Sequence, residues 1–297
     1  MTLRAIPSVP SSVTLLVLGA GWTWQFLQPL LIKEKITYAA TTTTGHDGTI
    51  PFKFDPEFTD IEAYKTLPIA KYVLVTFPLK GKGPSARLIA SYINSHSKEA
   101  GATKWIQLGS TGIFTAPDWN DSSSPIDESN ERAIAENELM RLGGCVLNLA
   151  GLYGATRQPG NWIGRVAKTK EALASKGALH LIHGADVARG VVGVVKGDLE
   201  GTKTSGSLFG RRWIVADCVS YDWWLLVWEF MGETLEDGKE DGSKIEERTK
   251  YRGWIVELME ENGIRGLPRP MDTLGRKLDA RGFWEAIGSS PTHSMAR

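Results

Sequence analysis

The sequence predicts an α/β protein built on a doubly wound parallel sheet, with a smaller C-terminal lobe. Short apolar runs alternate with helix-like segments from Val13 to Leu149, which is the order typical of parallel βαβ units. These runs are continuous rather than alternating, as in LLVL at 15–18 and YVLVTF at 72–77. Continuous apolar strands are typical of sheets that helices cover on both faces.

The first apolar run leads into a glycine turn and then a helix. Gly19 allows a tight turn after the strand, and Gly21 lets the backbone approach a diphosphate. The helix N-terminus then offers free N–H groups to that anion. The third fingerprint position, usually Gly or Ala, is Trp24. The stretch predicts the start of a Rossmann-type dinucleotide-binding unit; the alternative is a plain strand–turn–helix connection without a ligand.

The remaining elements of the first half follow in order. A β-branched stretch predicts a second strand at 37–44, and Pro29 should bend or shorten the helix before it. Further strands are expected at 50–54, 72–77, 105–108 and 145–149, and helices at 22–35, 58–67, 85–98 and 128–142, with a polar loop at 118–127. We assign residues 1–160 to a dinucleotide-binding core.

Residues 161–297 should complete this core and form the lobe on the substrate side. Helices are expected at 162–175, 187–195, 221–230, 252–262 and 271–288, and strands at 179–182 and 213–216. Asp186 is placed to cap the helix at 187–195. The segment 232–250 is nearly all polar or charged and holds three glycines, so we expect a mobile, dispensable surface insertion.

Composition excludes several classes of function. The formal net charge is zero, with 34 Lys+Arg and 34 Asp+Glu and no basic stripe, so nucleic acid is not expected as a partner. The five histidines and two cysteines form no metal-ligand pattern. The cysteines fit a reducing compartment, and no apolar run reaches the ~20 residues of a membrane span or forms a secretory signal. We expect a cytoplasmic protein without a membrane partner; the sequence leaves its oligomeric state open.

Several motifs in the same order resemble the extended short-chain dehydrogenase/reductase family, most closely its atypical, epimerase-like branch. These are Gly19-x-Gly21, Asp55, Thr76-Phe77-Pro78, Gly109-Ser110-Thr111-Gly112, Leu149–Gly154 and Leu179–Arg189. The resemblance covers roughly residues 13–288 and implies an NAD(P)-dependent protein with a Rossmann fold. It implies that the phosphate turn lies at Gly19 and Gly21, an adenine contact at Asp55, and a segment along the cofactor at Thr76, Phe77 and Pro78.

Two further positions bear on the cofactor. Trp22, inside the phosphate turn, is a candidate to cover the cofactor, although packing in the core is the alternative. The second strand ends in neutral hydroxyls at 41–44, among them Thr43, where NAD enzymes place a carboxylate for the ribose. Asp47 lies in a glycine-rich turn, where a turn role is expected. The absence of a carboxylate at the strand end favours NADP slightly over NAD.

The family's Tyr-x-x-x-Lys reaction centre is missing. Alignment on the helix puts Glu128 where the Tyr belongs and Arg132 where the Lys belongs; Trp105–Ala167 contains no lysine, and its only tyrosine is Tyr153. Arg132 can hold a phosphate or ribose hydroxyl but stays charged. Glu128 can act as the acid/base only if burial raises its pKa, and an exposed helix start is the simpler interpretation.

The candidate proton donors are therefore Ser110, Thr111 and Tyr153. Loop capping is the alternative role for Ser110 and Thr111, and packing is the alternative for Tyr153. Two functions follow from this. One is an oxidoreductase or epimerase that acts on a small polar, sugar-like substrate. The other is a sensor or regulatory module that binds a dinucleotide and has lost turnover.

Overall fold

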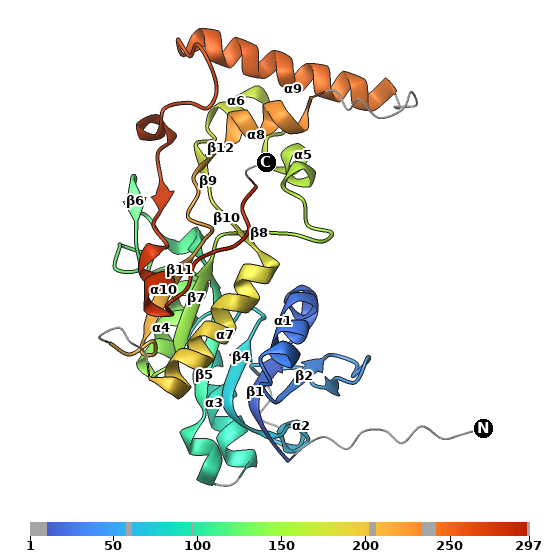
Figure 1. Ribbon diagram of the computed structural model, residues 1–297, viewed down its shortest axis with the longest axis vertical. Coiled ribbons are helices and arrows are strands. Elements are labelled where there is room, and N and C mark those ends of the chain that lie inside the picture. Colours follow the sequence, from blue (N-terminus) through green and yellow to red (C-terminus); the bar gives the residue numbers. More distant parts are fainter. Residues whose placement is uncertain (1–10, 58–60, 97, 202–205, 233–241, 296–297) are drawn as a thin grey trace, which may run out of the picture.

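The computed structural model describes residues 11–57, 61–96, 98–201, 206–232 and 242–295 of the 297-residue chain. Its centre is a seven-stranded sheet (Figure 1), in which every neighbouring pair is parallel. The strand order is β11-β7-β5-β4-β1-β2-β3. The strands are β1 (Ser12–Leu18), β2 (Tyr38–Thr42), β3 (Ile50–Pro51), β4 (Ile69–Val75), β5 (Lys104–Ser110), β7 (Cys145–Leu149) and β11 (Arg211–Val215). The predicted Rossmann-type parallel sheet is confirmed.

Burial on both faces explains the continuous apolar strands. In β1, Leu15 and Val17 pack into one hydrophobic cluster, while Leu16 and Leu18 pack into a second cluster on the opposite face. All four side chains are at most 1% exposed. A polar residue at any of these positions would face the core, because successive side chains of a strand point to opposite faces.

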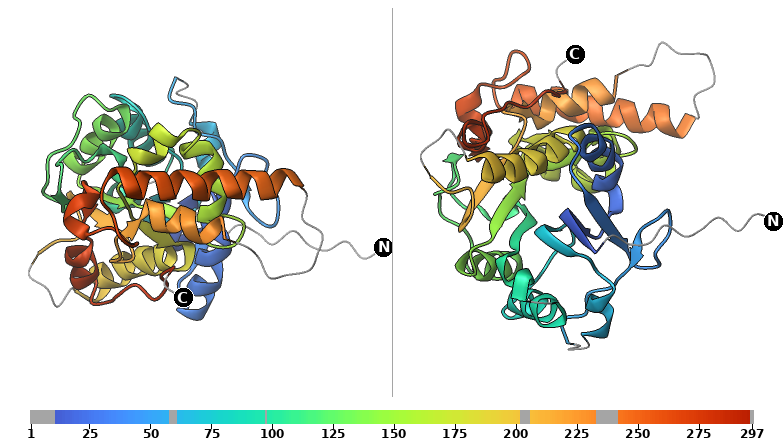
Figure 2. Two further views of the ribbon diagram at one scale, coloured as in Figure 1. Left: turned by 90° about the horizontal axis from the view of Figure 1, so that it is seen from above. Right: turned by 60° about the horizontal axis from the view of Figure 1, so that its bottom comes forward.

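Helices form a layer on each face of the sheet (Figure 2). The first cluster includes residues of α1 (Gly21–Lys33), α7 (Gly184–Glu200) and α10 (Arg281–Ala286), and α1 lies beside α7. The second cluster includes residues of α2 (Glu62–Lys65), α3 (Pro84–Ser95) and α4 (Glu131–Arg141). Trp24 on α1 is accommodated edge-to-face against Tyr38, with ring centroids 5.4 Å apart.

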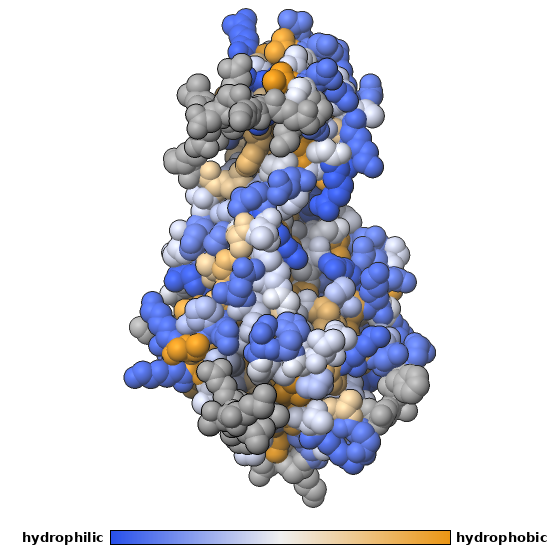
Figure 3. Space-filling view, turned by 90° about the vertical axis from the view of Figure 1, so that its right-hand side faces the viewer, coloured by the Kyte–Doolittle hydropathy of each residue, from blue (hydrophilic) through white to orange (hydrophobic). Residues whose placement is uncertain are grey.

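A third hydrophobic cluster forms the lobe at the top of Figure 1. It joins α5 (Ile163–Val166), α6 (Lys170–Ala174), α8 (Trp223–Phe230) and α9 (Gly242–Glu261). Trp224 and Ile255 are its centre, both at most 2% exposed. The space-filling view shows a mainly hydrophilic surface over this lobe (Figure 3). The smaller lobe is thus present, and the boundary after residue 160 remains a prediction.

The helix predicted at 162–175 is broken into three pieces. A 3-10 turn, η3 (Pro159–Trp162), leads into α5, and α6 starts separately. Thr169 is extended, and its hydroxyl accepts a hydrogen bond from Ala172 N at 3.2 Å, so it caps a new helix instead of continuing the old one.

The helix predicted at 271–288 is also wrong over most of its length. The 3-10 turn η4 (Met271–Leu274) ends at Gly275, whose φ is +67°. The chain then forms β13 (Lys277–Leu278), which pairs with β6 (Trp119–Asn120) inside the predicted 118–127 loop. Only α10 of the predicted helix remains.

Two short strand pairs replace the strand predicted at 179–182. β9 (Ala178–Leu179) pairs with β12 (Tyr221–Asp222), and β10 (Leu181–His183) pairs with β8 (Gly151–Tyr153). α7 starts before the predicted residue, and His183 caps it by accepting a hydrogen bond from Ala185 N at 3.2 Å. Asp186, the predicted cap, lies inside the first turn.

The predicted insertion at 232–250 is partly helical. Residues 242–250 form the first half of α9, which begins ten residues before the predicted 252. Tyr251 and Ile255 anchor the second half of α9 in the lobe. Because Glu, Lys and Arg are good helix formers, residues 242–250 extend the helix from this half toward its N-terminus. Residues 233–241 lie outside the described residues, and the mobility of the segment stays a prediction. No helix of the described chain is long and apolar enough to cross a membrane.

His180 should make the stability of this fold depend on pH. It is 7% exposed, and its Nε2 accepts a hydrogen bond from Leu278 N at 3.2 Å, which ties β13 to the β9–β10 link. Burial, with Arg276 and Lys277 nearby, lowers the pKa of His180 from 6.5 to about 4. Between these values the unfolded chain binds a proton that the folded chain does not, so stability should fall as the pH drops from 6.5 to 4.

We predict that the free energy of unfolding of His180→Gln falls less than that of wild type between pH 6.5 and 4, by on the order of 2–3 kcal/mol. Urea unfolding at several pH values across that window measures it. Wild-type protein measured in the same buffers gives the reference slope. An unchanged slope in His180→Gln would contradict the assignment.

Candidate functional site

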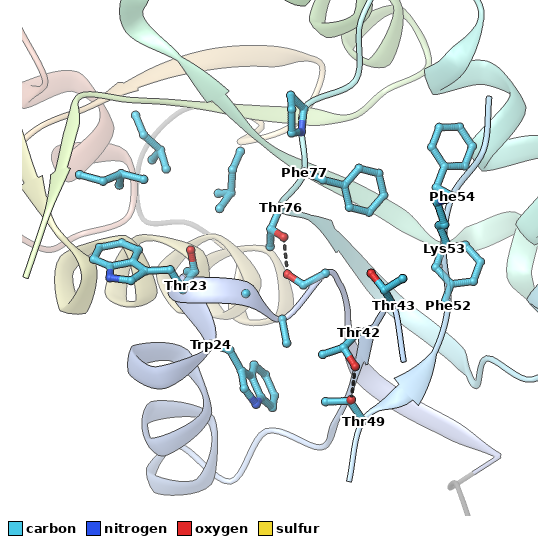
Figure 4. Close-up of a pocket in the computed structure, with 18 of the residues that line it drawn as sticks. Thr23, Trp24, Thr42, Thr43, Thr49, Phe52, Lys53, Phe54, Thr76 and Phe77 are labelled. Atoms are coloured by element: carbon cyan, nitrogen blue, oxygen red, sulfur yellow. Dashed lines mark hydrogen bonds between the residues drawn. The ribbon is translucent and has the colours of Figure 1, made fainter. Parts of the chain in front are cut away.

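A large cleft opens at the carboxyl ends of the strands, where the strand order reverses on either side of β1. Its volume is about 1060 Å³, at the top of the range of ~300–1,000 Å³ usual for small-molecule sites. Such a switch point is where open α/β sheets bind ligands. The lining residues are 19–24, 42–44, 46, 47, 49, 52–54, 76–78, 108–110, 132, 149, 150, 152 and 157 (Figure 4).

The glycine turn is fastened to both neighbouring strands. Gly19 N donates to Thr41 Oγ1 at 3.0 Å, and Ala20 N donates to Thr41 O at 2.7 Å. From the other side, the Thr76 hydroxyl donates to Gly19 O and, at 3.2 Å, to Leu18 O. Gly19 has φ +87°, and a Cβ there would lie 2.8 Å from Thr76 Oγ1. The turn therefore needs glycine for both its conformation and its close approach to β4.

The first turn of α1 faces the cleft without a capping side chain. Its N-cap is Ala20, which has no side chain able to accept a hydrogen bond, and no acidic residue lies in the first turn. Gly21 and Trp22 line the cleft here. A Cβ on Gly21 would meet no protein atom within 4 Å, so it would project into open space. Backbone N–H groups left free at a helix N-terminus form an anion site.

The end of β2 supplies hydroxyls to the cleft. Thr43 lines it, while Thr42 Oγ1 is 2.8 Å from Thr49 Oγ1 and accepts from Gly45 N at 3.0 Å (Figure 4). Asp47, with φ +52°, forms the tight turn that Thr49 N closes on His46 O at 3.0 Å. Its carboxylate is 92% exposed and lies 3.0 Å from His46 Nδ1. Asp47 thus has the turn role that its sequence setting suggests.

An aromatic wall lines the same side of the cleft. Phe54 and Phe77 are stacked, with ring centroids 6.0 Å apart and planes 20° from parallel (Figure 4). Lys53 and Pro78 extend this wall. Asp55, expected to contact adenine, does not line the cleft: it is exposed, and its Oδ1 accepts from Glu57 N at 2.9 Å.

Arg157 is a cleft residue that the sequence analysis missed. Its guanidinium carbon lies 4.5 Å from the centre of the Trp22 ring, and both residues line the cleft. This cation–π contact joins the loop after β8 to the start of α1. The sequence feature that could have pointed to Arg157 is its position as the single arginine in the glycine-rich loop after Tyr153.

The strand-end hydroxyls point in different directions. Ser110 lines the cleft, and its Oγ accepts from Gly112 N at 3.2 Å. Thr111 is 7% exposed, does not line the cleft, and donates to Leu149 O at 3.2 Å. Ser110 thus combines a capping role with access to the cleft, whereas Thr111 has only the structural bond.

Glu128 and Arg132 are not one turn apart on a helix. Asn130 caps α4 by accepting from Arg132 N at 3.0 Å, so the helix starts at Glu131 and Glu128 stays in the preceding turn. Glu128 is exposed and outside the cleft, while Arg132 lines it. The capping Asn is why the alignment did not predict the helix start.

A buried carboxylate that the sequence analysis also missed lies behind Ser110. Glu136 is fully buried; it accepts from Asn148 Nδ2 at 2.8 Å, from Arg212 Nη1 at 3.3 Å and from Ser110 N at 3.3 Å. Burial raises the pKa of Glu136, against the effect of these partners. Asn148 Nδ2 also donates to Ser110 O at 3.2 Å, so the pair holds the Ser110 backbone from both sides.

Tyr153 lies beside the cleft rather than in it. It is 7% exposed, its hydroxyl has no hydrogen-bond partner among the described residues, and its ring packs edge-on against His183 at 5.0 Å. Burial, together with Asp217 and Asp186, raises the pKa of Tyr153 above its ordinary value. Ala150 and Leu152, from the same segment, line the cleft instead.

The charges of the lining suit an anionic ligand. Lys53, Arg132 and Arg157 line the cleft, and Asp47 is the only carboxylate among the described lining residues. Ser110, at the end of β5, and Arg132, at the start of α4, are the polar side chains at this end of the cleft, and the described lining residues from β5, β7 and α4 include neither Tyr nor Lys. Among the described residues, no cluster of three or more His, Cys, Asp or Glu side chains is placed to hold a metal ion.

Comparisons with solved structures agree with this architecture. A conserved protein of unknown function from Silicibacter pomeroyi matches with a TM-score of 0.57 and 16% identity over 95% of this chain and 94% of that one. UDP-N-acetylglucosamine 4-epimerase from Bacillus cereus matches with a TM-score of 0.55 and 11% identity, over 95% and 94%. A short-chain dehydrogenase/reductase superfamily protein from Agrobacterium tumefaciens with bound NAD matches with a TM-score of 0.52 and 10% identity, over 95% and 93%.

No protein-family model and no curated protein sequence matches the chain. By structural similarity alone, the chain shares the Rossmann-type fold of these solved structures, as its motif order suggested.

Gly21→Val should weaken dinucleotide binding. The new side chain would project into the cleft at the α1 N-terminus and keep a diphosphate from the N–H groups. We expect the Kd for NAD(H) or NADP(H), measured by isothermal titration, to rise at least about tenfold, since charge-assisted hydrogen bonds are lost.

Gly143→Val is the matched control for backbone strain. Gly143 also has a positive φ, and a Cβ there would meet no protein atom within 4 Å, but it follows α4 and is outside the cleft. It should lose stability and keep the wild-type Kd. Equal binding by a folded Gly21→Val would rule out this site.

Proposed function

We propose that the protein binds NAD(H) or NADP(H) in this cleft, and that it is an oxidoreductase or epimerase for a small polar, sugar-like substrate. The observation that carries the proposal is the uncapped N-terminus of α1, which faces a cleft with an excess of cationic side chains. The fold shared with the A. tumefaciens protein, which holds NAD, supports it.

The lining suggests how the dinucleotide would lie. The diphosphate would accept hydrogen bonds from the first N–H groups of α1, with Arg157 and Trp22 at its side. The adenosine half would lie toward Thr43, Lys53 and the Phe54–Phe77 wall, and the nicotinamide toward Ser110 at the end of β5.

Residues at the adenosine end favour NADP slightly. Thr43 and Lys53 line the cleft there, and Lys53 could pair with a 2′-phosphate. The carboxylate of Asp47 also lines the cleft, but it belongs to the turn, where it lies 3.0 Å from His46 Nδ1.

The chain would orient both molecules and supply one proton. The nicotinamide, when bound, supplies the hydride chemistry. Ser110 is the best-placed hydroxyl, because Glu136 and Asn148 hold its backbone and the residue lines the cleft. Arg132 would hold a ribose hydroxyl or phosphate. Tyr153 is the other proposed donor, although it needs a route to the cleft.

The second candidate function is a dinucleotide sensor or regulatory module without turnover. It is favoured by the lining around Ser110, which has no Tyr–Lys pair to deliver a proton as hydride moves. General acid–base assistance of this kind is worth typically 10²–10⁴-fold in rate.

We therefore predict a poor general carbonyl reductase even with cofactor bound. A panel of aldehydes, ketones and nucleotide sugars, followed by nicotinamide absorbance and product analysis, measures this. Any turnover found should fall about 10²-fold or more in Ser110→Ala or Tyr153→Phe, whichever supplies the proton.

Glu128→Gln is the matched control for this panel, because Glu128 is exposed outside the cleft. Turnover that survives both hydroxyl variants and is lost in Glu128→Gln would overturn the assignment. Tight cofactor binding with no turnover across the panel would select the sensor.

A further inference from the structure

A second pocket, separate from the dinucleotide cleft, is a groove on the lobe. Residues of α8, of α9 and of the segment that follows α9 line it, and the two helices lie side by side at the top of Figure 1. Its volume is about 400 Å³, within the ~300–1,000 Å³ usual for small-molecule sites. It shares no lining residue with the cleft.

Hydrogen bonds at both ends fix the segment after α9 that forms one wall of the groove. At the end of α9, Ile264 N donates to Met259 O at 2.8 Å, just after Gly263, whose φ is +64°. This type of helix-ending turn folds the chain back onto its own helix. Further on, Asp222, the cap of α8, accepts from Arg269 N at 2.8 Å and from Arg269 Nη2 at 2.6 Å. The groove is therefore formed by fixed backbone.

Most of the lining is apolar and accessible to solvent. Val256 is 44% exposed, and Trp228, Met259 and Leu267 are only partly buried where they pack on the cluster of the lobe. Arg252, which does not line the groove, lies with its guanidinium carbon 4.0 Å from the centre of the Trp228 ring. A bound apolar group would cover area that water now contacts, which is favourable.

Negative charge gathers at the same place. Glu260 is the only charged residue among the described lining residues, and its carboxylate has no partner in the described part of the chain. Glu257 and Glu261, beside it on α9, share one cation, because Lys170 Nζ lies 2.6 Å from the first and 2.7 Å from the second. The last turn of α9 holds no basic residue, and a helix C-terminus is itself partly negative. The groove thus offers one unneutralised carboxylate beside an apolar surface.

We propose that this groove is a second ligand site, for a small molecule that carries an ammonium or similar cationic group on an apolar body. The apolar body would lie against Val256 and Trp228, and the cation would pair with Glu260. Residues 233–241, which precede α9 in the chain, hold five carboxylates and one lysine, so charge disfavours this segment as the occupant. The site goes beyond the proposed dinucleotide function and does not depend on it.

NMR of methionine methyl groups tests the site, because Met259 lines the groove and the chain has six methionines. Met259→Leu assigns the signal. Three probes share a phenylethyl body and differ in the charge of the end group: 2-phenylethylammonium, 2-phenylethanol and 3-phenylpropanoate. We expect the ammonium probe to shift the Met259 signal saturably, with a Kd about threefold or more below that of the alcohol, as one exposed ion pair allows. The carboxylate probe should bind most weakly.

Four substitutions at exposed positions of α9 separate charge from shape. Glu260→Gln should remove the preference for the ammonium probe and leave the Kd of the alcohol unchanged, whereas Glu246→Gln, outside the groove, should keep the preference. Val256→Arg adds bulk and a cation to the groove, so it should raise the Kd of the ammonium probe about tenfold or more. Ile245→Arg, also outside the groove and 51% exposed, should bind as wild type does.

Several results would overturn the site. They are the lack of a saturable Met259 shift with all three probes, equal Kd values for the ammonium and the alcohol, and a preference that survives in Glu260→Gln. A Met259 shift that appears on raising the protein concentration without a probe would make the groove a contact between copies of the chain. Failure of wild-type protein to bind NAD(H) or NADP(H) would count against the proposed function alone, because these probes need no dinucleotide.

Discussion

The bonds that hold the glycine turn between β2 and β4 determine the geometry of the cleft. Thr41 binds the turn from β2 and Thr76 binds it from the end of β4, and the Thr76 bond depends on the close approach that Gly19 permits. Because the turn is fixed on both sides, the first N–H groups of α1 face the crevice where the strand order reverses. The proposed anion site therefore results from the sheet and does not depend on a mobile loop.

Chemistry at the other end of the cleft depends on buried polar groups. Glu136 and Asn148 fix the backbone of Ser110 from beneath the cleft floor, and Arg212 balances the charge of Glu136. These groups orient a hydroxyl but do not themselves line the cleft. The arrangement suits binding and orientation of a dinucleotide better than rapid proton delivery. Tyr153, buried beside the cleft, is the tyrosine proposed as the other proton donor.

Sequence patterns predicted the sheet and the strand-end residues well, for a physical reason. Buried strands must be apolar throughout, and parallel strands end at one edge, so Gly21, Thr43 and Phe77 reach the same cleft. Side-chain direction in loops could not be predicted in the same way. Local hydrogen bonds decided three of these cases: Asn130 caps α4 after Glu128, Asp55 binds Glu57 N, and Thr169 starts a new helix inside 162–175. Thr111 and Tyr153 fold into the core, Arg157 stacks on Trp22, and pairing with β6 replaces part of the helix predicted at 271–288.

The central claim is that the α1 N-terminus holds a nicotinamide dinucleotide. Native mass spectrometry of the purified protein, with NAD(H) and NADP(H) added separately, measures this directly. The account predicts a complex of one dinucleotide per chain that survives transfer to the gas phase, and its mass identifies the preferred cofactor. Unbound protein with both cofactors at saturating concentration, from a sample whose fold is intact by circular dichroism, would contradict the account.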